Sequence, residues 1–162
     1  ILIGRVPGDS SHQQDLAILR QVMAETDTTS LRGQLYTQLS GGEKQRVQLA
    51  RVLAQIWDEQ DMTGRMLLLD EPTTALDLAH QQQLLKLLGT LTHRGLAVIV
   101  TLHDVTLLAA IAHRVLIIKA GRQMALGDTL SVFTEQLFAE VFSTRVMIAA
   151  HPTHGYPMVF PK

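Results

Sequence analysis

The amino-acid sequence predicts an α/β protein built on a parallel sheet. Three short apolar runs, within residues 66–69, 96–101 and 114–122, alternate with stretches of helical period. Short apolar runs with polar ends are typical of strands buried in a parallel sheet. Strand, helix, strand, helix and strand at this close spacing favour one α/β layer architecture. With 162 residues, 46% of them apolar, the chain is long enough for one domain with a real core.

Composition excludes several classes of function. The formal net charge is -1, which disfavours general nucleic-acid binding because that binding needs a basic excess. The absence of cysteine excludes disulfides and thiolate metal sites. No apolar run approaches the roughly 20 residues of a membrane helix. We therefore expect any work at a membrane to be done from outside the bilayer. The chain begins with Ile1 rather than Met and shows no signal peptide, so we expect further sequence upstream.

The first element is predicted as a helix within residues 9–27. Ser11 followed by Gln14 resembles a capping box, and apolar residues recur at helical spacing behind it. A turn-like stretch around Gly33 follows. A second helix begins after Gly42, has one apolar face and ends in the polar segment 57–64.

The middle of the chain alternates strands with helices. Pro72 ends the first strand, and Asp77 can cap a helix for which Gly95 is a natural residue after the last turn. Asp104 caps a further helix to about His113, and Ala120–Gly121 forms a turn after the third strand. Beyond Gly127 we expect one or two short helices and then two short strands around the loop 151–156.

Two carboxylates come directly after the first strand. Asp70 and Glu71 end a buried parallel strand, and ligands of such sheets bind just outside the carboxyl ends of strands. Because successive strand residues point in opposite directions, the two groups can serve different tasks. One can hold Mg²⁺ and the other can activate a water molecule. An ordinary helix cap or ion pair explains the pair equally well on this evidence alone.

A glycine-rich loop precedes the second helix, in the stretch "QLSGGEKQRVQLARVL". The free backbone N–H groups at a helix start form an anion site, and the small residues Ser40, Gly41 and Gly42 let a phosphate approach. A plain N-cap is the simpler interpretation. His103 follows the second strand and is predicted at the same sheet edge as Asp70, where an imidazole can contact a phosphate. A structural histidine is the alternative there.

Taken in order, these stretches resemble the ATP-binding subunits of ABC transporters. Residues 39–43, Leu-Ser-Gly-Gly-Glu, match the signature motif, and residues 67–70 followed by Glu71 match Walker B with its catalytic glutamate. Residues 75–77 match the D-loop, and His103 matches the switch histidine. The P-loop and the Q-loop glutamine, which precede the signature in that family, have no counterpart here. The stretches "GRVP", "DEPTTALDLAHQQQLL" and "HPTHGYPMVFP" look most like bacterial haem-importer ATPases.

The resemblance implies a P-loop NTPase-type parallel sheet flanked by helices, with a site for ATP and Mg²⁺. Residues 1–57 would be the rest of a helical subdomain, 58–127 an ATPase core without Walker A, and 128–162 a small extension. Glu71 and His103 would be catalytic, and Asp70 would hold the metal. The remaining nucleotide contacts it implies are Leu39, Ser40, Gly41, Gly42, Glu43 and Asp77.

The same resemblance implies partners and a place of work. Two such subunits would form a head-to-tail homodimer beneath two membrane permease subunits, on the cytoplasmic face of the bacterial inner membrane. A periplasmic substrate-binding protein would act with them indirectly, and no nucleic acid is expected. The chain alone, lacking a P-loop, is expected to be inactive. Import of ferric siderophores or cobalamin, and a non-transport ABC ATPase, remain alternatives to haem import.

Overall fold

The computed structural model describes residues 1, 11–58 and 60–162, which form two compact units, residues 1–101 and 102–162. The stretch "GRVP" at residues 4–7 lies outside the described residues. The division predicted from the sequence, at 57/58 and 127/128, stays a prediction. No helix in the described residues is long and apolar enough to cross a membrane.

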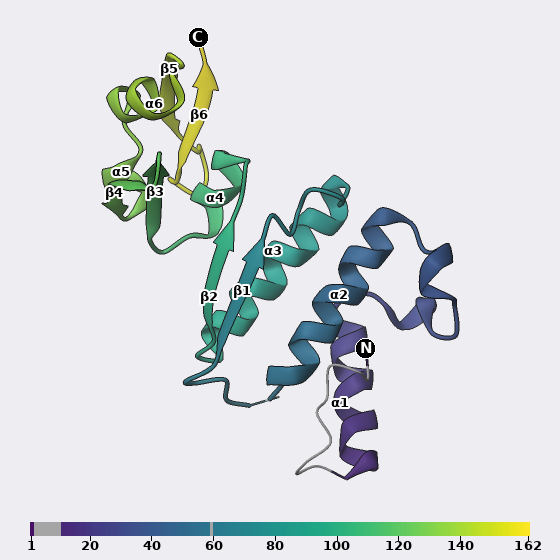
Figure 1. Cartoon of the computed structure of the whole chain (residues 1–162). Helices are drawn as coiled ribbons and strands as arrows, with labels where there is room; N and C mark the ends of the chain where they lie inside the picture. Colours follow the sequence, from purple (N-terminus) through teal and green to yellow (C-terminus); the bar gives the residue numbers. More distant parts are fainter. Residues whose placement is uncertain (2–10, 59) are drawn as a thin grey trace. The chain divides into compact units, whose positions relative to one another are not determined.

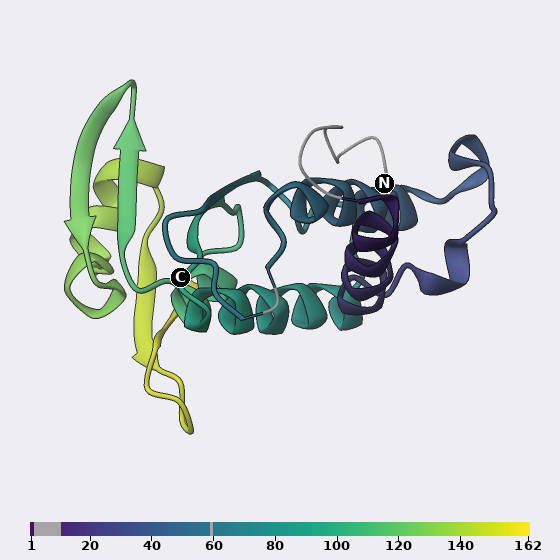
Figure 2. The same ribbon diagram turned by 90° about the horizontal axis from the view of Figure 1, so that it is seen from below.

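The first unit opens with helices. Its elements up to the sheet are α1 (His12–Glu25), the 3-10 turns η2 (Thr29–Leu31) and η3 (Tyr36–Gln38), and α2 (Gly41–Ile56). The predicted capping box at α1 is confirmed, since the Ser11 N–H donates to Gln14 and the Gln14 N–H donates to Ser11 Oγ. Helix α1 packs against α2, as Figure 2 shows.

A two-stranded parallel sheet follows. Strand β1 (Met66–Asp70) pairs in register with β2 (Ala97–Thr101), and α3 (Leu78–His93) connects them (Figure 1). Asp77 caps α3, and Gly95 follows its last turn with φ +91°, both as predicted. Side chains of α2 and α3 form the core of this unit with Leu67 of β1.

The two strands are not buried on both faces, contrary to the prediction. Leu67 is 1% exposed, whereas Met66 and Ile99 are each 55% exposed and Leu68 is 66% exposed. Because strand side chains alternate, one face of the sheet packs on the core and the other is open within this unit. A continuous apolar run shows that a strand is apolar but not what covers each of its faces.

The polar segment after α2 contributes two residues to the core of the first unit, which its composition does not indicate. Trp57 and Met62 are buried in the core, and the Trp57 indole N–H donates to Gln21 at 2.9 Å. Asp58 accepts the backbone N–H groups of Gln60 and Asp61 and pairs with Arg65 at 3.2 Å. Two large apolar side chains therefore anchor this connection to the first unit.

The second unit contains two antiparallel hairpins and three helices among its described elements. These are α4 (Val105–Ile111), β3 (Val115–Lys119), β4 (Arg122–Gly127), α5 (Thr129–Val132), α6 (Glu135–Phe142), β5 (Val146–Ala150) and β6 (Pro157–Pro161). Its core includes Val115, Phe133 and Phe138. The predicted helices and strands of the tail are confirmed.

The third predicted strand pairs differently from the prediction. Strand β3 pairs antiparallel with β4 in a hairpin (Figure 2). Both residues of its turn, Ala120 and Gly121, have positive φ. The turn was predicted, but β4 was not, because Arg122–Gly127 carries little apolar pattern. The two-residue turn favours the antiparallel pairing of β3 with β4, and the spacing of apolar runs along the chain does not predict that pairing.

Candidate functional site

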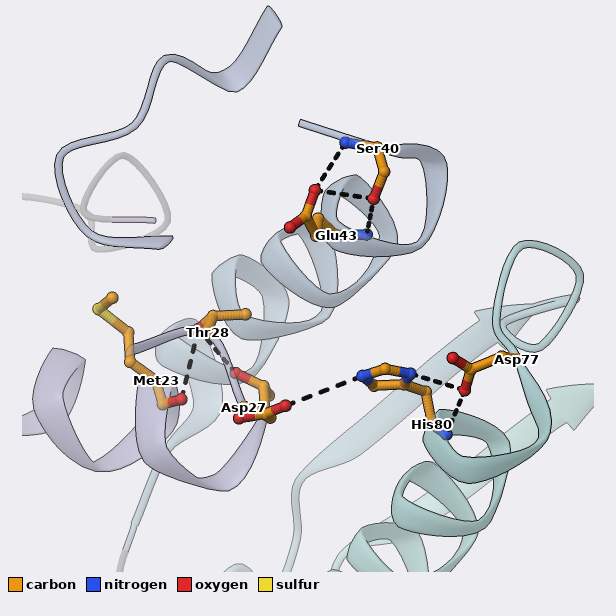
Figure 3. A network of polar contacts seen from close by, with 8 residues as sticks. Met23, Asp27, Thr28, Ser40, Glu43, Asp77 and His80 are labelled. Atoms are coloured by element: carbon orange, nitrogen blue, oxygen red, sulfur yellow. Dashed lines mark hydrogen bonds and ion pairs between the residues drawn. The ribbon is translucent and has the colours of Figure 1, made fainter. Parts of the chain in front are cut away.

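The start of α2 is held by a reciprocal cap. The Glu43 carboxylate accepts both the backbone N–H and the hydroxyl of Ser40, each at 2.7 Å, and the Glu43 N–H donates to Ser40 Oγ at 3.4 Å (Figure 3). The hydroxyl and backbone of Ser40 together lower the pKa of Glu43. The N-cap interpretation is confirmed, and it is compatible with anion binding because the N–H groups of Gly41 and Gly42 precede any intrahelical acceptor.

Packing also favours glycine at position 42. A Cβ on Gly42 would lie 2.9 Å from the carbonyl oxygen of Ala75, whereas one on Gly41 would lie 3.8 Å from Ala75 Cβ, an ordinary contact. The first turn of α2 thus lies against the turn that leads to Asp77. Sequence reasoning assigned both glycines to phosphate approach and did not detect this contact, which joins residues far apart in the chain.

A cavity of about 380 Å³ lies where these two segments meet. Its lining comprises Ser40, Gly42, Glu43, Arg46, Ala75, Leu76, Asp77 and His80. The structure therefore brings most of the predicted loop together with Asp77. Leu39 is buried and is not among the residues that line this cavity. Arg46 and His80 were not predicted, although each lies three residues, one helical turn, beyond a predicted residue.

Glu71 adopts a strained backbone. Its φ of +46° lies in the left-handed region, which side chains other than glycine rarely adopt, and such strain concentrates at functional sites. The Glu71 N–H donates to both oxygens of Thr101, and its carbonyl accepts Gln45 Nε2 of α2 at 3.4 Å. Non-local contacts thus fix this turn, and one of them comes from the helix that Ser40 caps.

The two carboxylates have separate partners. The Thr101 hydroxyl donates to Asp70, and the Thr74 hydroxyl donates to Glu71 Oε2 at 3.3 Å. Strand alternation is not the cause, because β1 ends at Asp70 and Glu71 already belongs to the turn. The prediction that Asp70 and Glu71 serve different tasks therefore rests on their different hydrogen-bond partners and not on strand alternation.

The residues present can supply only part of the ligands of a Mg²⁺ ion. The described residues contain no group of three or more His, Asp or Glu side chains placed to hold a metal ion. Asp70 is an exposed carboxylate at the end of β1. Mg²⁺ commonly takes one or two carboxylates and completes its sphere with phosphate oxygens and water. Asp70 thus suits a metal that arrives with a nucleotide.

A larger cavity of about 750 Å³ adjoins these residues. Gly41 and Gln45 of α2, Asp70 of β1 and His80 of α3 are among the residues that line it. The predicted metal ligand and the predicted phosphate loop therefore border one space within the first unit.

His103 belongs to the second unit. It is exposed at the bend before α4, whose N-cap Asp104 accepts the N–H groups of Thr106 and Leu107. Its predicted place beside Asp70 and Glu71 stays a prediction.

Comparison with known proteins gives consistent matches. The sequence profile of the ABC transporter family matches residues 9–74. The chain is 42% identical over 163 residues to the hemin import ATP-binding protein HmuV of Gloeobacter violaceus, covering 99% of this chain and 59% of that protein. It is 41% identical to HmuV of Pseudomonas aeruginosa, covering 96% of this chain and 60% of that protein.

Solved structures share the fold. A metal-chelate type ABC transporter in an inward-facing conformation superimposes with a TM-score of 0.77 at 25% identity, covering 99% of this chain and 64% of that one. The dimeric ABC transporter cassette MJ0796 gives a TM-score of 0.63 at 26% identity, covering 78% of this chain and 52% of that one. The chain spans 59% and 60% of the two curated relatives named above. The motifs, the fold and these matches together identify the chain as sequence of an ABC transporter ATPase domain.

Proposed function

We propose that this chain supplies the signature and Walker B parts of an ATP-hydrolysing subunit that powers import of haem or a related iron chelate. The observation that carries the proposal is the cavity where the capped start of α2 meets Asp77, with Asp70 and Glu71 at the end of the adjoining strand. A helix start and a pair of carboxylates are the groups that phosphoryl transfer needs for positioning and charge stabilisation.

The start of α2 binds phosphate in this proposal. The N–H groups of Gly41 and Gly42 have no acceptor inside the helix, and the helix dipole favours an anion beside them. In the head-to-tail dimer these groups and Ser40 contact the γ-phosphate of ATP held by the partner subunit. Glu43 keeps the loop in shape through its two bonds from Ser40. Asp77 lies at the dimer interface.

The end of β1 serves the ATP of the same subunit. Asp70 holds Mg²⁺, which when bound neutralises charge on the phosphates. Glu71 accepts a proton from the attacking water, and its strained, tethered backbone keeps the carboxylate in place. His103 contacts the γ-phosphate of that same ATP.

The names of two relatives support the substrate, and the dimeric form of the cassette MJ0796 supports a dimer. HmuV of Gloeobacter violaceus and of Pseudomonas aeruginosa are named as hemin import ATP-binding proteins. We infer a homodimer, two membrane permease subunits, indirect action with a periplasmic binding protein, and a position on the cytoplasmic face of the inner membrane. Ferric-siderophore or cobalamin import is the second candidate, because the superimposed transporter is of the metal-chelate type.

A chimera tests the proposal. This chain would replace the matching segment of the Pseudomonas aeruginosa relative, and the chimera would be assayed for ATP hydrolysis and, in cells without that relative, for haem uptake. Glu71→Gln should lower kcat at least about 100-fold, the usual contribution of a general base. Glu135→Gln, the same change in a residue that pairs with Lys162 in the second unit, should leave kcat unchanged.

The outcomes separate the two parts of the proposal. Hydrolysis that survives Glu71→Gln would exclude Glu71 as the base. Normal hydrolysis by a chimera that restores no haem uptake would retain the ATPase and remove the haem assignment, and uptake assays with a ferric siderophore or cobalamin would then test the second candidate.

A further inference from the structure

His80 lies between two carboxylates from separate parts of the first unit. Its Nδ1 is 2.7 Å from Asp77 Oδ1, and its Nε2 is 3.8 Å from Asp27 Oδ2 (Figure 3). Asp77 caps the start of α3, whereas Asp27 follows the end of α1. The imidazole thus spans two turns that are 50 residues apart in the sequence.

Hydrogen bonds fix the backbone of the turn at Asp27, although the Asp27 side chain itself is 64% exposed. Asp27 has φ +50°, and the threonines on both sides of it are buried. Thr26 Oγ1 donates to Val22 O at 2.8 Å and lies 3.1 Å from Thr28 Oγ1, and the Thr28 N–H donates to Met23 O at 2.9 Å. Buried hydrogen bonds therefore fix the backbone from which the carboxylate projects.

The chemistry of the ring suits a link between acids. The imidazolium form carries hydrogen on both nitrogens and a positive charge, so it can donate to Asp77 at 2.7 Å and attract the Asp27 carboxylate across 3.8 Å, whereas a neutral ring can donate to one acceptor only. Asp77 Oδ1 also accepts the His80 backbone N–H at 2.9 Å. The contacts from His80, the backbone one first, lower the pKa of Asp77.

We propose that His80 is a positioning residue that ties the Asp77 turn to the turn after α1. It would keep Asp77 in place beside Ser40 and Gly42 in the shared cavity. The expected effect of His80 on nucleotide binding rests on the proposed function, whereas its contacts with Asp27 and Asp77 do not.

Amide hydrogen exchange of the 162-residue chain tests the link without nucleotide. The probe is the His80 backbone N–H, whose protection depends on Asp77. Asp27→Asn removes the charge while keeping a residue that tolerates a left-handed backbone. We expect it to speed exchange at His80 about 1.5- to 5-fold, the range of an exposed ion pair. Glu25→Gln is the matched control, because Glu25 pairs with Arg94 instead and should have no effect at His80.

Introducing Asp27→Asn into two His80 variants tests whether its effect passes through the His80 imidazole. His80→Asn places an amide near the position of Nδ1 and loses the reach to Asp27, while His80→Gln reaches as far as Nε2 and weakens the contact with Asp77. Each cuts one contact of the link, so Asp27→Asn should change exchange at residue 80 in neither, and either variant suffices if the other does not fold. The proposal is overturned if Asp27→Asn acts equally in these backgrounds, or no more strongly than Glu25→Gln in the wild-type chain.

Discussion

The contact between Gly42 and Ala75 gives the sharpest stability prediction. In Gly42→Ala the new Cβ would lie 2.9 Å from a backbone carbonyl oxygen, closer than such atoms approach, so α2 or the Ala75 turn must shift. Inserting a methyl group into a packed site costs about 1–3 kcal/mol. Alanine gains up to about 1 kcal/mol over glycine in helix propensity. We expect Gly42→Ala to be neutral or to lose up to about 2 kcal/mol of unfolding free energy.

Gly41→Ala is the matched control. Its Cβ would lie 3.8 Å from Ala75 Cβ, so it gains the propensity without the clash. The two variants should therefore differ by about 1–3 kcal/mol, with Gly42→Ala the less stable. Urea unfolding measures the difference through the fluorescence of Trp57, the only tryptophan, which is buried in the first unit. Equal stabilities for the two variants would refute the close approach of α2 to the Ala75 turn.

Three further predictions concern the same unit. Ser40→Ala removes the cap of α2 and should cost about 1 kcal/mol of unfolding free energy, while the exposed Thr37→Ala should cost less than about 0.5 kcal/mol; equal losses would contradict the cap. Because the folded state lowers the pKa of Glu43 and of Asp77, their stabilisation is present above the unfolded pKa of about 4 and is lost as pH falls below it. The urea concentration at the unfolding midpoint should therefore fall less between about pH 5 and about pH 3 in Glu43→Gln than in the wild-type chain. An equal fall in both would count against the Ser40–Glu43 bonds. The 162-residue chain has no G-x-x-x-x-G-K-[ST] stretch and should release no phosphate from ATP above background, so Glu71-dependent release would overturn the proposed division of the site.

Local features were predictable from the sequence. Ser11, Asp77 and Asp104 cap helices as expected, and Gly95 ends one, because caps depend on residues within one turn of each other. The order of strands and helices in the first unit followed from apolar period and turn residues in the same way.

Features that join distant segments were not predictable. The contact of Gly42 with Ala75, the bond from Gln45 to Glu71 and the link from His80 to Asp27 each connect residues far apart in the chain. The open face of the parallel sheet and the antiparallel pairing of β3 with β4 were missed for a related reason: an apolar run does not specify its neighbours. The predicted site residues were recognised by order and resemblance, whereas the placement of Ser40, Gly42, Glu43 and Asp77 around one cavity required the fold.

In the proposed function, the start of α2 is one half of a nucleotide site that a second subunit completes. The most direct measurement is the ATP-dependent mass of the chimera by light scattering. With Glu71→Gln, ATP should remain bound and the protein should become a dimer. Adding Ser40→Arg, which places a bulky side chain in the shared cavity, should keep ATP bound and leave the protein monomeric. A Glu71→Gln protein that binds ATP as a monomer, or a double variant that dimerises equally well, would contradict a nucleotide site shared between two subunits.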